Sequence, residues 1–223
     1  MTLEERLSEV TARAATAAAR AGRSIDELTI IPVTKFHPAS LVRELYALGV
    51  RDVAENRHQE AREKAVELAD LTDLRWNFVG QLQGKKARQV RSYAHIIHSV
   101  DRASLIDSLS SEDDDTSIFL QVNLTDDPGR GGAAAEQLEE LTEYALRAPG
   151  IRLEGLMAVA PLGVEPQAAF ARVRELSERI RLIAPMASSI STGMSADFEF
   201  AIAEGATHLR IGTAITGNRP TDG

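Results

Sequence analysis

Short apolar stretches alternate along the chain with longer segments in which apolar residues recur every three or four positions. The short stretches, such as residues 29–34 and 95–100, are rich in β-branched residues and are typical of buried strands. The longer segments, such as residues 2–21 and 166–183, have the periodicity of amphipathic helices. The pattern therefore predicts strands and helices in alternation, which favours a parallel sheet.

About eight strands are expected, and that number in 223 residues favours a closed (β/α)8 TIM-type barrel over an open sheet. The strands are predicted at residues 29–34, 52–54, 76–80, 95–100, 117–123, 153–157, 188–191 and 209–211. No helix is expected after the last strand, so the N-terminal helix at residues 2–21 is expected to close the ring. No linker divides the chain, and we expect one domain over residues 1–223.

Composition narrows the classes of function. A formal net charge of −8 argues against a nucleic-acid partner, and the absence of cysteine excludes disulfides and thiolate chemistry. The five histidines are scattered, which indicates no metal site. No apolar run reaches membrane-spanning length, and the charged N-terminal segment does not have the pattern of a signal peptide. We expect a cytoplasmic protein with no membrane partner.

Lys35 is the candidate nucleophile. It follows the apolar run 28–34, where a buried strand opens into a loop. A desolvated ammonium loses its proton more readily, and the resulting amine can attack a carbonyl. The alternative is a side chain that extends to water. The other lysines, Lys64, Lys85 and Lys86, lie in polar surroundings and are interpreted as solvated surface residues.

Two glycine-containing turns follow the last two predicted strands, at residues 191–195 and 211–214. Loops in these positions commonly bind phosphate in barrels of this type. Glycine allows the backbone to approach an anion closely, and the N–H groups at a helix start can then bind it. The alternative is a pair of ordinary capped turns, but their common position favours an anion site.

Arg210 lies between Leu209 and Ile211 on the last strand, so its side chain and theirs are expected on opposite faces. An inward arginine costs several kcal/mol unless it has a partner. The pyridine nitrogen of pyridoxal 5′-phosphate (PLP) is a suitable acceptor, since a guanidinium can only donate. A sugar phosphate, as in a class I aldolase, is the other ligand considered for a lysine opposite a phosphate site. A carboxylate partner, from Glu199 or Glu204, is the alternative for the arginine.

An ordered set of motifs spans nearly the whole chain. It closely resembles the pyridoxal phosphate homeostasis protein family, also called the YggS/PROSC family, which looks like the barrel domain of alanine racemase without its second β-domain. The matching stretches are residues 32–35, 55–60, 76–83, 98–102, 121–123, 155–157, 191–197 and 210–213.

The resemblance implies a PLP site with Lys35 as the Schiff-base lysine and Arg210 facing the pyridine nitrogen. Asn56 would lie beside the ring or its hydroxyl, and backbone at residues 193–195 would help to hold the phosphate. The expected cofactor-binding residues are Lys35, Asn56, Met157, Ser191, Gly193, Met194, Ser195, Arg210, Gly212 and Thr213, with Ser191, Gly212 and Thr213 on the phosphate.

The sequence departs from the family pattern at four positions. Asn77 replaces a usual histidine, Ala54 a usual glycine, and Thr216 a common phenylalanine. Arg130 stands where the family often has a lysine in the loop after the fifth strand. Since arginine cannot form a Schiff base, a second reacting lysine in that loop is in doubt.

The resemblance implies intracellular PLP homeostasis and delivery without robust turnover, with PLP-dependent apoenzymes as possible partners of a monomer. The main alternative is a PLP-dependent amino-acid racemase, and a class I aldolase is a third, weaker alternative. A two-base racemase needs a second acid–base group, which is a tyrosine from the missing domain in alanine racemase. All tyrosines here, Tyr46, Tyr93 and Tyr144, fall on predicted helices or helix ends. We therefore favour the carrier and expect no catalytic residue.

Overall fold

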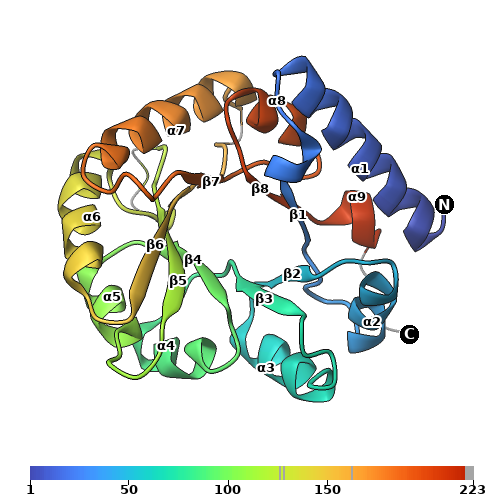
Figure 1. Cartoon of the computed structure of the whole chain (residues 1–223), viewed down its shortest axis with the longest axis horizontal. Helices are drawn as coiled ribbons and strands as arrows, with labels where there is room; N and C mark the ends of the chain where they lie inside the picture. The colour runs from blue at the N-terminus through green and yellow to red at the C-terminus, as the bar shows by residue number, and fades with distance from the viewer. Residues whose placement is uncertain (126, 128, 162, 219–223) are drawn as a thin grey trace.

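Eight parallel strands form a nearly closed barrel in the computed structural model, which describes residues 1–125, 127, 129–161 and 163–218. The strands follow the ladder order β1-β8-β7-β6-β5-β4-β3-β2. An isolated parallel bridge between Val33 and Ala54 joins β1 to β2 and completes the ring (Figure 1). The expected (β/α)8 barrel is confirmed.

The strands are short, and each is followed by a helix or helical turn on the way to the next. Their bounds are β1 (Thr29–Pro32), β2 (Asp52–Glu55), β3 (Arg75–Phe78), β4 (Ile96–Val100), β5 (Thr116–Gln121), β6 (Ile151–Met157), β7 (Ser189–Ser191) and β8 (His208–Ile211).

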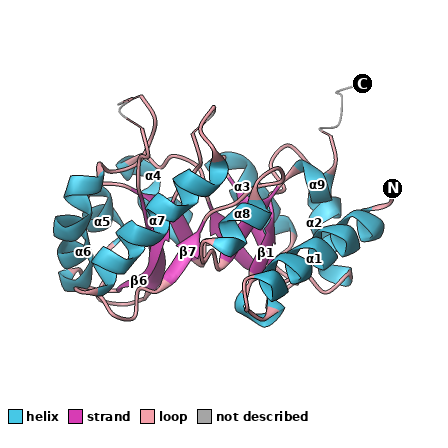
Figure 2. Cartoon of the chain, turned by 90° about the horizontal axis from the view of Figure 1, so that it is seen from above, coloured by secondary structure: helices cyan, strands magenta, loops and turns pink. Residues whose placement is uncertain are grey.

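The helices lie outside the strands, as the side view also shows (Figure 2). They are α1 (Leu3–Arg20), α2 (Ala39–Ala47), α3 (His58–Glu67), α4 (Gly84–Arg91), α5 (Ala103–Leu109), α6 (Leu138–Arg147), α7 (Pro166–Arg181), α8 (Phe198–Ala203) and α9 (Thr213–Thr216), with single 3-10 turns η1 (Ile25–Glu27) and η2 (Ala135–Gln137). No helix in these described ranges is long and apolar enough to cross a bilayer.

The N-terminal helix α1 closes the ring of helices, as expected. Its Val10, Ala14 and Ala18 are buried in one apolar cluster with Leu209 and Ile211 of β8. The small alanine side chains let α1 lie close to the barrel, where it contacts α8 and α9 (Figure 1). One detail of the expectation was wrong, because the short helix α9 does follow β8.

The start of α5 has no side-chain cap. Asp101 is a favourable N-cap residue by type, but Arg102 is the residue that precedes α5 and no side chain caps that helix. The Asp101 carboxylate instead accepts a hydrogen bond from the Arg102 guanidinium at 2.5 Å. An ion pair with its neighbour thus takes the oxygen that would otherwise cap the helix.

The barrel interior is polar and aromatic, whereas the space between strands and helices is apolar. On β8, Leu209 and Ile211 pack toward α1, so Arg210 takes the opposite, interior face. The ring of Phe119 on β5 stacks on the ring of His98 on β4, with centroids 4.7 Å apart. The carboxyl ends of all strands open at one end of this interior, and that end holds the candidate site.

Candidate functional site

Several of the predicted site residues do end neighbouring strands. Met157 and Ser191 are the last residues of β6 and β7 and are register partners. Ile31 on β1 is the register partner of Arg210 on β8, and Lys35 follows four residues later along the chain. Lys35 and Arg210 therefore stand on adjacent strands at the same end of the barrel.

Lys35 is partly buried and lies in a turn just beyond β1. The preceding Thr34 is anchored to β2, because its N–H donates to Ala54 O at 2.9 Å. Phe36, with a φ of 66°, then turns the chain, and its N–H donates to the Glu60 carboxylate at 2.6 Å. Within the described part of the chain no hydrogen bond or ion pair holds the Lys35 amine, whose nitrogen lies 5.9 Å from the centroid of the Phe36 ring. This amine is therefore available for chemistry.

Lys64 contrasts with Lys35, and its interpretation as a solvated surface residue was wrong. Its side chain is 7% exposed, and its amine contacts Glu55 Oε1 at 2.7 Å and Glu60 Oε1 at 2.8 Å. The amine also donates to Thr34 O at 2.9 Å. Since three oxygens hold this ammonium, it fixes the loop that carries Lys35 and is not available as a nucleophile.

Among the residues that the structure describes, Glu55 Oε2 and Asn56 Oδ1 are buried oxygen atoms at this end of the barrel without a hydrogen-bond partner. Burial raises the pKa of Glu55, although the contact with Lys64 acts in the other direction. Gly80 lets β3 pass beside Asn56, because a Cβ there would lie 2.0 Å from Asn56 O. Buried polar atoms are usually paired, so the free Asn56 Oδ1 marks a place for a donor from a ligand.

Arg210 is 5% exposed and enters no ion pair among the described residues. One guanidinium nitrogen donates to Ser191 Oγ at 2.7 Å and another to Ala158 O at 2.9 Å. Burial lowers the pKa of Arg210 to about 10. A carboxylate partner is ruled out for both named candidates, since Glu199 pairs with Arg13 and Glu204 with Arg174.

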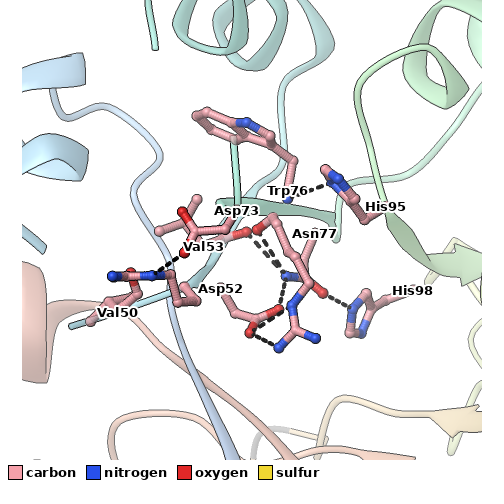
Figure 3. Close-up of polar contacts among 10 residues, drawn as sticks. Val50, Asp52, Val53, Asp73, Trp76, Asn77, His95 and His98 are labelled. Atoms are coloured by element: carbon pink, nitrogen blue, oxygen red, sulfur yellow. Dashed lines mark hydrogen bonds and ion pairs between the residues drawn. The ribbon is translucent and has the colours of Figure 1, made fainter. Parts of the chain in front are cut away.

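Sequence reasoning missed two residues that support this arginine from inside the barrel. His98 is fully buried; its Nδ1 lies 2.8 Å from Ser191 Oγ and its Nε2 lies 2.9 Å from Asn77 Oδ1. The Asn77 amide donates in turn to Asp52 Oδ1 at 3.2 Å (Figure 3). Burial, and then the charge of Arg210, lower the pKa of His98 well below its usual value. The available signal was the alternation along each strand, which places Asn77 between Trp76 and Phe78 and His98 beside Ile97, on the face opposite these apolar residues.

The turns after β7 and β8 lie side by side. Ser195 Oγ accepts from the N–H of Ala214 at 3.2 Å, and the N–H of Arg210 donates to Gly193 O at 3.0 Å. Gly193 has a φ of +91°, a conformation that favours glycine, and a Cβ there would lie 2.7 Å from Ala201 Cβ. The structure thus brings the two predicted anion-binding turns into one place.

Other predicted members of these turns differ in their surroundings. The N–H of Met194 donates to Asp197 Oδ1 at 2.6 Å, so it is already occupied. Thr213 is exposed at the start of α9, and a Cβ at Gly212 would meet nothing within 4 Å. The space beside Gly212 and Thr213 is therefore open to a ligand.

Two further features of the mouth concern the function. The Asn123 amide donates to backbone oxygens of Asp127 and Arg130, so it holds its own loop after β5 in shape. The tyrosine hydroxyls contact other groups: Tyr46 contacts Asp73, Tyr144 contacts Asp107, and Tyr93 contacts His58. None of these hydroxyls bonds to a predicted site residue in the described ranges.

Comparisons with known proteins agree with this architecture. The family described as "Alanine racemase, N-terminal domain" matches residues 6–220. A pyridoxal phosphate homeostasis protein of Pseudomonas aeruginosa is 41% identical over 225 residues, covering 98% of this chain and 96% of the relative.

Among solved structures, PipY of Synechococcus elongatus PCC7942 resembles the chain in two states. The structure without PLP has a TM-score of 0.85 at 36% identity, covering 97% of this chain and 100% of PipY. The structure with PLP bound has a TM-score of 0.82 at 35% identity, with the same coverage.

The Lys64 network makes a prediction about stability. Lys64→Met leaves the Glu55 carboxylate buried without its cation, which should lower the free energy of unfolding by about 3–5 kcal/mol. A raised folded-state pKa of Glu55 means that the folded state binds more protons, so this loss should grow as pH rises above the ordinary carboxyl range. Urea unfolding at pH 5 and pH 8 measures both effects.

The matched control is Lys86→Met, which removes an exposed lysine and should change stability by less than about 0.5 kcal/mol. Equal effects of the two substitutions, or a loss that shrinks at pH 8, would contradict the burial of this ion pair.

Proposed function

We propose that this chain, which belongs to the pyridoxal phosphate homeostasis protein family, holds PLP at the mouth of its barrel and serves in intracellular supply of the cofactor. The carrying observation is Arg210, a buried guanidinium with no carboxylate partner in the described residues. A buried cation of this kind needs an acceptor that is neutral or supplied by a ligand. We further propose that residues 1–223 act as one PLP-binding domain in the cytoplasm.

The residues fit the ring of PLP at two points. Arg210 can only donate, and the pyridine nitrogen in its unprotonated form can accept that hydrogen bond. The free Asn56 Oδ1 is an acceptor, which suits the ring hydroxyl or the proton of a Schiff base. An arginine at the ring nitrogen disfavours protonation of the ring and so weakens the electron withdrawal on which most PLP enzymes depend.

Lys35 is proposed as the covalent attachment point. The Lys35 amine would hold the aldehyde carbon of PLP through a C=N bond, with the carbonyl oxygen released as water. Two observations support Lys35 over Lys64 as the attachment point. The Lys35 amine has no hydrogen bond or ion pair among the described residues, whereas the Lys64 amine forms three hydrogen bonds.

The phosphate is proposed to lie against the turns after β7 and β8. The support is the open space beside Gly212 and Thr213 and the contact that joins the two turns. The backbone N–H groups of Gly193 and Ser195 and the Thr213 hydroxyl would donate to the anion, since the N–H of Met194 is taken by Asp197. Met157 would then line the site from the end of β6.

The role of carrier is favoured over that of racemase by the positions of the tyrosines. A racemase needs a second acid–base group on the face of the ring opposite the lysine. Tyr46 and Tyr144 bond to aspartates on outer segments, and Tyr93 stacks on His58 with ring centroids 5.9 Å apart. Delivery to PLP-dependent apoenzymes by a monomer is part of the same proposal.

Lys35→Ala should abolish the visible and near-ultraviolet absorbance of the PLP-loaded protein, because the Schiff base would have lost its amine. The measurement is a spectrum before and after borohydride, with peptide mapping of the reduced lysine. Lys86→Ala is the control and should keep the band. A reducible adduct on another lysine in Lys35→Ala would reject the assignment.

The phosphate should supply much of the affinity for PLP. Charge-assisted hydrogen bonds contribute about 1.5–3 kcal/mol each, so pyridoxal without phosphate should bind at least about a hundredfold more weakly. Thr213→Ala should weaken PLP by part of that factor and hardly change pyridoxal, as titrations of absorbance would measure. Thr11→Ala, at an exposed position of α1, is the control. Equal affinities of the wild type for both ligands would place the phosphate elsewhere.

Racemisation of alanine should be negligible in the purified, PLP-loaded protein, since the second acid–base group is missing. Chiral chromatography of product measures it, with an alanine racemase as positive control. Turnover in the ordinary enzymatic range of about 1–10³ per second would favour the racemase instead.

A further inference from the structure

A series of buried hydrogen bonds crosses the barrel interior and ends at Arg210. Asp52 on β2 contacts Asn77 on β3, and Asn77 contacts His98 on β4. His98 then reaches across to Ser191 on β7, which accepts from Arg210 on β8. Figure 3 shows the first part of this series, with Asn77 between Asp52 and His98. Asp52 also forms an ion pair with Arg75.

The two groups at the ends of this series have fixed hydrogen-bond roles: Asp52 accepts and Arg210 donates. An ionised carboxylate accepts only, and Asp52 is ion-paired with Arg75, so Asn77 turns its NH2 group toward Asp52. Its carbonyl oxygen therefore faces His98 and needs a donor. At the other end a guanidinium donates only, so Ser191 Oγ is an acceptor toward Arg210.

These two ends fix the proton positions between them. His98 carries its proton on Nε2, which donates to Asn77 Oδ1 at 2.9 Å, and its Nδ1 is an acceptor. The hydroxyl proton of Ser191 then points to His98 Nδ1, 2.8 Å away. The reverse arrangement would place the Asn77 carbonyl against the Asp52 carboxylate, where two acceptors repel each other.

We infer that Asn77, His98 and Ser191 form a hydrogen-bond relay of fixed direction that positions Arg210 for the ring of the ligand. The inference rests on the proposed function and refines it. Because the single proton of Ser191 is committed to His98, the Ser191 hydroxyl has none left to donate to a phosphate. Ser191 is therefore a positioning residue that serves Arg210 on the ring side of the site.

The relay depends on the chemistry and burial of Asn77 and His98. The uncharged side chain of Asn77 has both an amide donor and a carbonyl acceptor. When its NH2 group donates to Asp52, its carbonyl oxygen is left to accept from His98. Asn77 and His98 are 1% and 0% exposed, so no water from outside can replace a missing partner easily.

The first test needs neither a variant nor a ligand. Ring-nitrogen NMR of ligand-free, ¹⁵N-histidine-labelled protein at pH 7 should show His98 as the neutral form protonated on Nε2 only. A neutral ring protonated on Nδ1, or a doubly protonated ring, would overturn the relay. This result stands whether or not the protein binds PLP, so a failure here is distinct from a failure of the proposed function.

The second test separates the two sides of the site with PLP and pyridoxal. Ser191→Ala and His98→Leu should each weaken both ligands by a similar factor, roughly tenfold, because Arg210 loses its support toward a ring that both ligands share. Thr213→Ala should weaken PLP alone. A Ser191→Ala protein that loses affinity for PLP but not for pyridoxal would show a phosphate contact and overturn the inference.

His208→Gln is the control for the loss of a partly buried ring in the barrel interior. His208 packs on the same Phe119, with centroids 5.1 Å apart, but bonds to Thr207 rather than to Ser191 or Arg210. It should leave the affinities for both ligands within about twofold of the wild type. If His208→Gln and His98→Leu lose affinity equally, the loss comes from disturbed packing in the barrel interior. That outcome would reject the positioning role of His98. Circular dichroism confirms that each variant is folded before titration.

Discussion

The buried guanidinium of Arg210 is the constraint on which the rest of the barrel interior depends. A full charge inside a barrel is unfavourable unless every donor finds an acceptor. The structure provides two of them, Ser191 Oγ and Ala158 O, but no carboxylate within the described residues. These two acceptors are neutral, and Asp197, whose charge raises the pKa of Arg210, forms no ion pair with it in the described part of the chain. Under the proposed function, the ligand offers the further acceptor.

A second charged network lies at the mouth, and there the buried cation does have carboxylate partners. Lys64 forms ion pairs with both Glu55 and Glu60, and the hydrogen bonds of these carboxylates hold Thr34 and the N–H of the residue after Lys35. The barrel thus contains one lysine that is fully committed to structure and, beyond β1, one whose amine is left without an ion pair. The two lysines differ because Lys64 has carboxylate partners and Lys35 has none among the described residues.

In both networks, charged groups have fixed donor or acceptor roles, and these roles determine how the neighbouring groups are hydrogen-bonded. In the interior, Asp52 and Arg210 set the direction in which protons point, and the neutral Asn77 and His98 transmit it. At the mouth, carboxylates fix a backbone turn. The bond between His98 and Ser191 crosses the interior from β4 to β7, and the mouth network joins the segment after β1 to β2, where the ring closes. Both networks therefore depend on the curvature and closure of the barrel.

The sequence alone determined the alternation of strands and helices, the barrel, and the placement of Lys35 and Arg210, because these follow from periodicities of two and 3.6 residues along a local stretch. It misjudged Lys64, since helical spacing does not reveal that the buried Glu55 carboxylate lies beneath one face of α3. It also missed the relay, whose partners are 21 and 93 residues apart. Only the curved ring brings Ser191 of β7 within hydrogen-bond distance of His98 on β4, so the direction of those bonds was decided by tertiary structure.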